Sequence, residues 1–139
     1  MAPEQAGIAR RQGTLVDMKV LLVEDSKFIR VSTERALSQA GYQVTSAEDG
    51  EQALRLAREQ LPSLILLDIM LPRISGPDVL KALKADSATA SIPVIVLTSL
   101  SQKNAQQLEK DGAAGFFEKS ELSKGHTSLL AAIGKILKK

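Results

Sequence analysis

The sequence predicts an α/β fold built on a doubly wound, five-stranded parallel sheet with helices on both faces. Three observations lead to this prediction. Short unbroken apolar runs alternate with longer segments of helical periodicity, and this pairing repeats five times from Met18 onward. The runs lack polar alternation, which is typical of strands covered on both faces. Parallel neighbours need long crossover connections, and the helical segments supply them.

The five strand candidates differ in strength. The clearest is Lys19-Val20-Leu21-Leu22-Val23, in which only the first residue is polar. Similar runs lie at residues 64–67 and 94–97, and weaker candidates lie at residues 43–46 and 115–118. All of them have the ordinary length of a strand.

A helix candidate with recognisable ends follows each strand. Ser26 can cap the first, and Gly41 can stop it. Pro62 ends the second, and Gly76-Pro77 begins the third, because proline is tolerated in a first turn. The second to fifth helices are expected at about residues 51–59, from residue 76 through Leu83, at residues 102–110 and from residue 127 to the end.

Size and composition predict one domain in residues 18–139, preceded by a flexible arm or linker in residues 1–17. With 139 residues, 44% of them hydrophobic, the chain can bury one core. A net charge of +2 and 3% aromatic residues argue against direct nucleic-acid binding. The chain has no cysteine, which fits a reducing, cytoplasmic location. It shows neither a signal peptide nor an apolar stretch of membrane-spanning length, so no membrane partner is expected.

Reactive side chains gather at the carboxyl ends of the expected strands. Ligands bind at this edge of open α/β sheets, near the point where strand order reverses, so we expect these side chains to converge. Singly, each has an ordinary explanation as a turn residue, a helix-start charge or a solvated lysine. The set comprises Glu24 and Asp25 after the first strand, Asp68 and Thr98 ending the third and fourth, and Lys119 after the fifth.

This set predicts a phosphoryl-transfer site. Three clustered carboxylates repel one another unless a cation relieves the repulsion. Oxygen ligands without histidine or cysteine favour Mg²⁺. A carboxylate nucleophile, a metal, the Thr98 hydroxyl and the Lys119 ammonium are together the parts that phosphoryl transfer needs.

Four sequence fragments, in this order and spacing, resemble the response-regulator receiver family over about residues 18–139. They are Val23-Glu24-Asp25-Ser26, Leu66-Leu67-Asp68-Ile69-Met70-Leu71-Pro72 with Gly76 after it, Val96-Leu97-Thr98, and Phe116-Phe117-Glu118-Lys119. The resemblance implies a flavodoxin-like strand order, 2-1-3-4-5, and a phosphoacceptor domain of a two-component system.

The resemblance also implies the roles of the acidic residues. Asp68 is implied as the phosphoacceptor, and Glu24 and Asp25 as the acidic pair that binds Mg²⁺ together with it. Met70 is implied as a further metal ligand through its backbone carbonyl. The phosphoryl donor would be a histidine kinase or a phosphotransfer protein.

Three more residues would carry the response. Lys119 is implied as the phosphoryl contact, Thr98 as the switch hydroxyl and Phe116 as the switch aromatic. Inward movement of Thr98 would make room for Phe116 and change the surface of the fourth helix, fifth strand and fifth helix. That surface would be read by a downstream protein that the sequence does not identify.

The sequence departs from the family pattern at three places. Ser120 stands where the family usually has a proline, often preceded by a cis peptide bond. A cis peptide bond before serine costs about 3–4 kcal/mol. We therefore expect either a trans peptide with an altered loop or local strain. Phe116 lacks the hydroxyl of the common tyrosine. Met70 and Leu100, two positions beyond Asp68 and Thr98, are apolar, so we expect slow self-dephosphorylation.

Alternative functions stay open at this point. A receiver-like module could signal by protein contact without phosphorylation, which Ser120 leaves open although the complete set of five side chains argues against it. A common type of aspartyl phosphatase would need a second acid where Met70 stands, and a flavin protein would need a phosphate cradle and stacking aromatics.

We expect His126, the only histidine, to be exposed. We expect no output domain after the last helix, so that the chain would be a stand-alone receiver or one excised from a longer protein.

Overall fold

The computed structural model describes residues 18–99 and 105–137. The arm or linker expected at residues 1–17 lies outside the described residues, as does Leu100. Within the two described ranges, no helix combines the length and the apolar character needed to cross a membrane.

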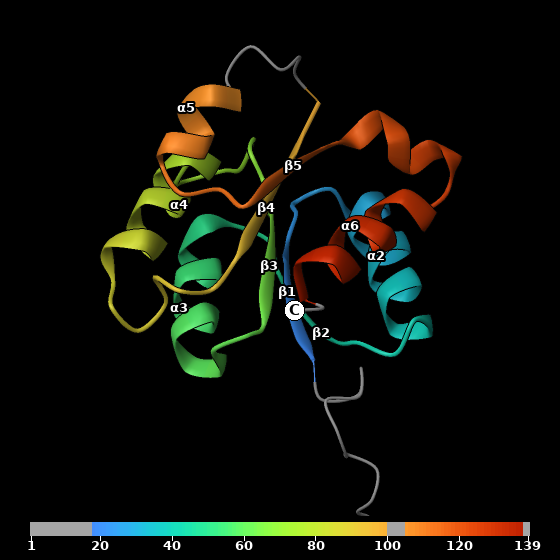
Figure 1. Cartoon of the computed structure of the whole chain (residues 1–139), viewed down its shortest axis with the longest axis horizontal. Helices are drawn as coiled ribbons and strands as arrows, with labels where there is room; N and C mark the ends of the chain where they lie inside the picture. Colours follow the sequence, from blue (N-terminus) through green and yellow to red (C-terminus); the bar gives the residue numbers. More distant parts are fainter. Residues whose placement is uncertain (1–17, 100–104, 138–139) are drawn as a thin grey trace, which may run out of the picture.

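Five parallel strands form one sheet in the order β2-β1-β3-β4-β5, which confirms the predicted fold class and strand order (Figure 1). β1 pairs with β2 on one side and with β3 on the other, so the chain reverses its direction of sheet growth there. The carboxyl ends of β1 and β3 are therefore the switch point. The strands are β1 (Lys19–Val23), β2 (Gln43–Ala47), β3 (Leu64–Asp68), β4 (Val94–Thr98) and β5 (Gly115–Glu118).

Helices cover both faces of the sheet (Figure 1). One face carries α2 (Lys27–Gln39) and α6 (Thr127–Leu137); the other carries α3 (Gly50–Gln60), α4 (Gly76–Ala85) and α5 (Ala105–Lys110). A 3₁₀ helix, η3 (Lys119–Lys124), connects β5 to α6. The helix expected at residues 102–110 is described only from Ala105 onward.

Side-chain alternation along the central strands supplies two separate cores. Leu21 and Val23 of β1 pack with residues of α3, α4 and α5, whereas Val20 and Leu22 pack with residues of α2 and α6. All five residues of β3 are buried. Burying one large aliphatic side chain stabilises the folded state by about 1.5–3 kcal/mol. The centre of the sheet is therefore stable and holds the turns at its edge in place.

Capping side chains begin three of the helices at the carboxyl edge of the sheet. Ser26 caps α2, as predicted, and accepts a hydrogen bond from the Ile29 N–H at 3.5 Å. Asp49 caps α3 and Ser75 caps α4 in the same way. The caps satisfy N–H groups that have no partner inside the helix, and so they fix where each strand-to-helix turn ends.

Leu61 ends α3 in the left-handed conformation, with φ 46° and ψ 62°. Its N–H donates to the Ala57 carbonyl at 2.9 Å, and its side chain is 55% exposed. The β-carbon of an L residue in this conformation crowds the following carbonyl oxygen at a cost of about 1–2 kcal/mol. Glycine would adopt the same conformation without that cost.

We expect Leu61→Gly to raise the free energy of unfolding by about 0.5–1 kcal/mol, because relief of the strain exceeds the added entropy of the unfolded chain. Urea titration measures the change. The matched control, Leu61→Ala, removes the same exposed side chain but keeps the β-carbon, and it should gain nothing. Equal stability of the two variants would contradict the prediction.

Candidate functional site

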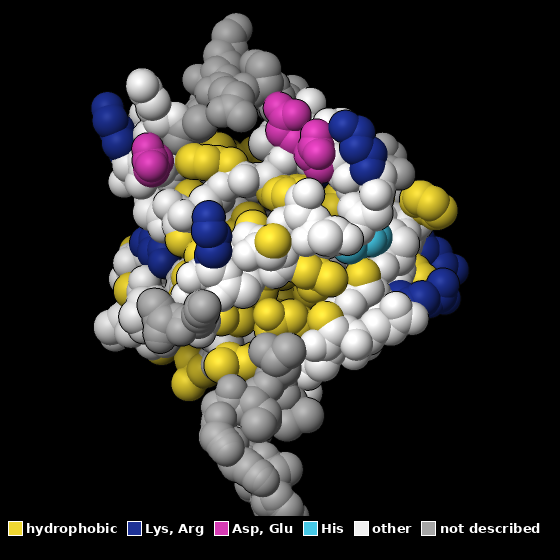
Figure 2. Space-filling model, turned by 45° about the vertical axis from the view of Figure 1, so that its right-hand side comes forward, with side chains coloured by type: hydrophobic (Ala, Val, Ile, Leu, Met, Phe, Trp, Pro, Cys, Tyr) yellow, Lys and Arg dark blue, Asp and Glu magenta, His cyan; other side chains and the backbone are white. Residues whose placement is uncertain are grey.

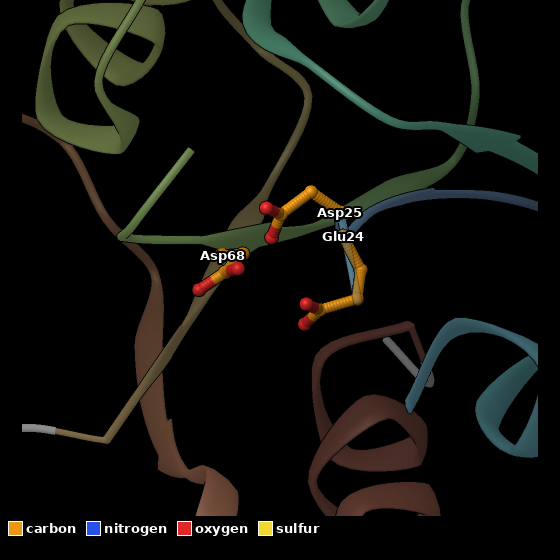
Figure 3. A group of neighbouring side chains, drawn as sticks. All are labelled: Glu24, Asp25 and Asp68. Atoms are coloured by element: carbon orange, nitrogen blue, oxygen red, sulfur yellow. The ribbon is translucent and has the colours of Figure 1, made fainter. Parts of the chain in front are cut away.

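Three carboxylates converge at the switch point of the sheet. Glu24 and Asp25 directly follow β1, and Asp68 is the last residue of β3. One oxygen from each lies within 4.8 Å of the others. In Figure 3 the three side chains point toward a common space. The structure thus brings together the acidic residues that the sequence predicted to converge.

Glu24 is held from several directions and is completely buried. Its backbone N–H donates to the Ala47 carbonyl at 3.0 Å, and its Oε2 accepts from the Ser26 N–H at 3.0 Å. Burial, and to a smaller extent the Asp68 charge, raise the pKa of Glu24, although the Ser26 N–H and the Lys119 ammonium oppose that shift. A cation close to this carboxylate therefore favours its ionised form.

Lys119 lies between the two buried carboxylates. Its Nζ is 3.1 Å from Glu24 Oε1 and 3.0 Å from Asp68 Oδ1, and its side chain is only 16% exposed. Burial alone would lower the pKa of Lys119, but its hydrogen bonds and charge interactions with Asp68 and Glu24 together outweigh burial and raise it. The ammonium is thus kept charged between the two carboxylates.

The peptide between Lys119 and Ser120 is trans, as are all peptide bonds in the described ranges. The chain turns directly into η3 at Lys119. Of the two outcomes expected for the proline-to-serine departure, the structure shows the trans peptide, in the loop that begins at Lys119. That loop still places the ammonium against Asp68.

Asp68 is fixed on one side and unsatisfied on the other. Its Oδ1 accepts from the Met70 N–H at 3.2 Å and contacts Lys119. Its Oδ2 is buried, and no hydrogen-bond partner reaches it from the described residues. A buried oxygen without a partner is costly unless a ligand satisfies it.

Gly76 packs the first turn of α4 against the end of β3. A β-carbon on Gly76 would lie 2.5 Å from both the Asp68 carbonyl oxygen and Ile69 Cα. The Gly76 N–H donates to the Ile69 carbonyl at 3.1 Å. The absence of a side chain therefore allows α4 to hold the turn that presents Asp68.

The donor set fits a hard divalent cation. All three converging groups are carboxylates, and the partnerless Asp68 Oδ2 offers a lone pair. Mg²⁺ prefers such oxygen ligands and needs only one or two carboxylates in addition to water and phosphate oxygens. Met70, the fourth expected ligand, lies at the site through its N–H, and its side chain is 61% exposed.

Thr98 and Phe116 lie on neighbouring strands and face the same side of the sheet. Phe116 is opposite Val96, and Thr98 follows Val96 by two residues, so their side chains share one face. Both are half-buried, and Phe116 packs against the core beneath α3, α4 and α5. The switch roles expected for this pair stay predictions.

The expectation that His126 is exposed is wrong. The residue is half-buried, and its Nε2 lies 3.2 Å from the hydroxyl of Thr33, a fully buried residue of α2. Figure 2 shows only part of the histidine at the surface. The packing of α6 beside α2 brings the two residues together. The sequence signal was indirect, because Thr33 lies on the same helical face as buried Leu37.

Arg30 contacts the site but was not predicted to do so. Its Nη1 donates to the Glu24 carbonyl at 3.2 Å, and its Nη2 lies 3.6 Å from Glu48 Oε2. Its position one turn beyond the Ser26 cap could have suggested the contact, since i and i+4 residues share a helix face.

Comparison with known proteins points to one family. Residues 20–131 match the sequence model described as the response regulator receiver domain. A probable transcriptional regulator, ycf27 of Guillardia theta, is 43% identical over 82 residues, which are 59% of this chain and 31% of that protein. The polar-differentiation response regulator DivK of Brucella anthropi is 38% identical over 93 residues, 67% of this chain and 76% of that protein.

Solved structures show the same likeness. The receiver domain of the sensor histidine kinase PA1611 from Pseudomonas aeruginosa, with a magnesium ion coordinated in its active site cleft, superposes with a TM-score of 0.79 at 27% identity over 88% of this chain and 98% of that one. The chemotaxis response regulator CheY4 of Vibrio cholerae gives 0.69 at 33% identity over 73% and 86%. The chain spans only about a third of the length of several relatives that it matches, such as ycf27.

We expect Mg²⁺ to stabilise the fold, because a ligand that binds only the folded state shifts the unfolding equilibrium. In EDTA, Asp25→Asn should raise the unfolding midpoint by relieving carboxylate repulsion, and it should gain less from added Mg²⁺ than the wild type gains. Thermal unfolding measures both effects. Asp78→Asn, on exposed α4 surface, is the control and should respond to Mg²⁺ like the wild type. A response of Asp25→Asn equal to that of the wild type would contradict the prediction.

Burial lowers the pKa of His126 below its ordinary value of 6.5. The unfolded chain therefore binds this proton at a higher pH than the folded chain, and stability should fall as the pH drops below 6.5. His126→Gln removes the titration, so its free energy of unfolding should fall less than that of the wild type between about pH 7.5 and about pH 5.5. Urea titrations at the two pH values measure this; parallel losses would show that His126 has no part in the effect.

Proposed function

The chain belongs to the response regulator receiver family, and on that premise we propose that it accepts a phosphoryl group on Asp68 as part of a two-component system. The observation that carries the proposal is the state of the Asp68 carboxylate. One oxygen is oriented by the Lys119 ammonium and the Met70 N–H, while the other is buried without a partner among the described residues. Such an oxygen is available as a nucleophile or a ligand.

In the proposed reaction an Asp68 oxygen attacks the phosphorus of a phosphohistidine on a histidine kinase or a phosphotransfer protein. A new P–O bond forms an acyl phosphate as the P–N bond to the imidazole breaks. The imidazole keeps the electron pair of that bond and takes up a proton to leave as neutral histidine. The chain thus contributes a nucleophile that needs no deprotonation by a general base.

Glu24, Asp25 and Asp68 would hold Mg²⁺, with the Met70 backbone carbonyl as a further ligand. When bound, Mg²⁺ supplies positive charge to the phosphoryl oxygens and lowers the cost of bringing that anion among carboxylates. Lys119, at the start of η3, contributes a second positive charge. Its ammonium is already largely shielded from solvent and lies against Asp68. A preformed cation of this kind stabilises charge without reorganising during the reaction.

We propose that Thr98 and Phe116 transmit the effect of phosphorylation from Asp68 to the surface of the protein. The Thr98 hydroxyl, at the end of β4, would donate a hydrogen bond to a phosphoryl oxygen. Because Phe116 shares its face of the sheet, movement of Thr98 would alter the space available to the ring. The surface formed by α5, β5 and α6 would change as a result and be recognised by a downstream protein.

The surroundings of the site favour a protein donor over a small enclosed substrate. Asp25 is exposed, and it lines the same pocket as Met70, which is 61% exposed. Phe28, in the first turn of α2 after Asp25, is 82% exposed. Exposed apolar groups next to a reactive centre are typical of contact with another macromolecule. Met70 argues against a phosphatase, because a common type of aspartyl phosphatase needs an acid group at this position and Met70 offers none.

Treatment with acetyl phosphate and Mg²⁺ should add one phosphoryl group to the wild type and none to Asp68→Asn. Intact-mass spectrometry and peptide mapping measure the product. Lys119→Met should slow the reaction by about 10²-fold, as expected when a preformed charge partner is lost. Asp78→Asn is the matched control for an aspartate outside the site and should react normally. A modified Asp68→Asn protein, or an unreactive wild type, would refute the proposal and leave the phosphorylation-independent module.

A further inference from the structure

Arg30 is the most enclosed basic residue of α2, since Lys27 and Arg35 are both exposed. Its side chain is 14% exposed, although it carries a charge and lies only one turn from the start of the helix. Burying a guanidinium is costly unless its donors are satisfied. The contacts that satisfy it are therefore informative.

The first contact is with the backbone of Glu24. Arg30 Nη1 donates to the Glu24 carbonyl at 3.2 Å. The N–H of the same residue donates to the Ala47 carbonyl at the end of β2. Both backbone polar groups of Glu24 are thus fixed, one by β2 and the other by α2. The next residue, Asp25, is exposed and follows directly from this fixed peptide unit.

The second contact is with the neighbouring turn. Arg30 Nη2 lies 3.6 Å from Glu48 Oε2, and Glu48 directly follows β2. Arg30 therefore links the turn after β1, which holds the acidic pair, to the turn after β2. A planar guanidinium can serve two acceptors in different directions, whereas an ammonium on a lysine stem is a single point charge.

We propose that Arg30 is a positioning residue for the divalent cation: it holds the Glu24 carbonyl and so sets the place of the Glu24 and Asp25 carboxylates. The inference rests on the proposed metal-dependent function but concerns a residue that touches neither the cation nor the phosphoryl group. Groups that orient metal ligands from behind typically change metal affinity 10- to 100-fold when they are lost. Loss of Arg30 should therefore weaken Mg²⁺ binding but should not slow the reaction at Asp68 once Mg²⁺ is bound.

The test compares Arg30→Met, which keeps the aliphatic stem, with the wild type by calorimetric titration with Mg²⁺. We expect the dissociation constant to rise by about tenfold. Arg30→Lys should recover only part of the loss, because it replaces one of the two contacts. Arg35→Met is the matched control, since it removes an exposed arginine from the same helix and should bind Mg²⁺ like the wild type.

Phosphorylation by acetyl phosphate provides a second readout. Arg30→Met should need about tenfold more Mg²⁺ for the half-maximal rate, while the rate at saturating Mg²⁺ should stay near that of the wild type. A merely structural role would lower the unfolding midpoint without moving the Mg²⁺ requirement, so thermal unfolding is recorded for every variant.

The two proposals fail in different ways. Unchanged Mg²⁺ affinity in Arg30→Met, or equal weakening in Arg35→Met, overturns the role of Arg30 and leaves the proposed function intact. A wild type that binds Mg²⁺ but takes up no phosphoryl group refutes the proposed function while the affinity comparison still decides the role of Arg30. A wild type that binds no Mg²⁺ overturns both.

Discussion

The ammonium of Lys119, lodged between two buried carboxylates, is the interaction on which the rest of the site depends. Glu24 and Asp68 are both almost completely removed from solvent, and their charges repel. A positive charge beside them relieves that repulsion and favours the ionised form of Glu24. Lys119 supplies that charge from the start of η3, directly after β5, which lies two strands away from β3 in the sheet. A chemically reactive arrangement is thereby made compatible with a stable fold.

The sheet makes this arrangement possible through its connectivity. The strands that supply Glu24, Asp25 and Asp68 are direct neighbours at the point where strand order reverses. Their centres are buried in two hydrophobic cores, and helix caps end the turns beyond β1, β2 and β3. Rigid strands with short capped turns can place carboxylates within a few ångströms of one another. Longer loops would hold the carboxylates less precisely, because ordering more residues costs more conformational entropy.

Much of this could be predicted from sequence because it depends on local pattern. Apolar runs specify buried parallel strands, and the ends of such strands share an edge, so the convergence of Asp68 with the acidic pair follows. The contact between Thr33 and His126 could not be predicted, since it joins residues 93 positions apart through the packing of α2 against α6. Arg30 was missed because its partner is a backbone carbonyl, so that only its helical position beyond Ser26, and no pairing of side-chain types, points to the contact. The conformation after Lys119 was left open between two outcomes, and only coordinates distinguish them.

The close approach of Gly76 to the end of β3 has a consequence for how a signal leaves the site. No room is left for even a β-carbon between Gly76 and the Asp68-Ile69 turn, so α4 and this turn cannot move closer together there. Thr98, at the end of β4, and the residues of β5 are only half-buried. A displacement that begins at Asp68 would therefore meet more resistance toward α4 than toward Thr98.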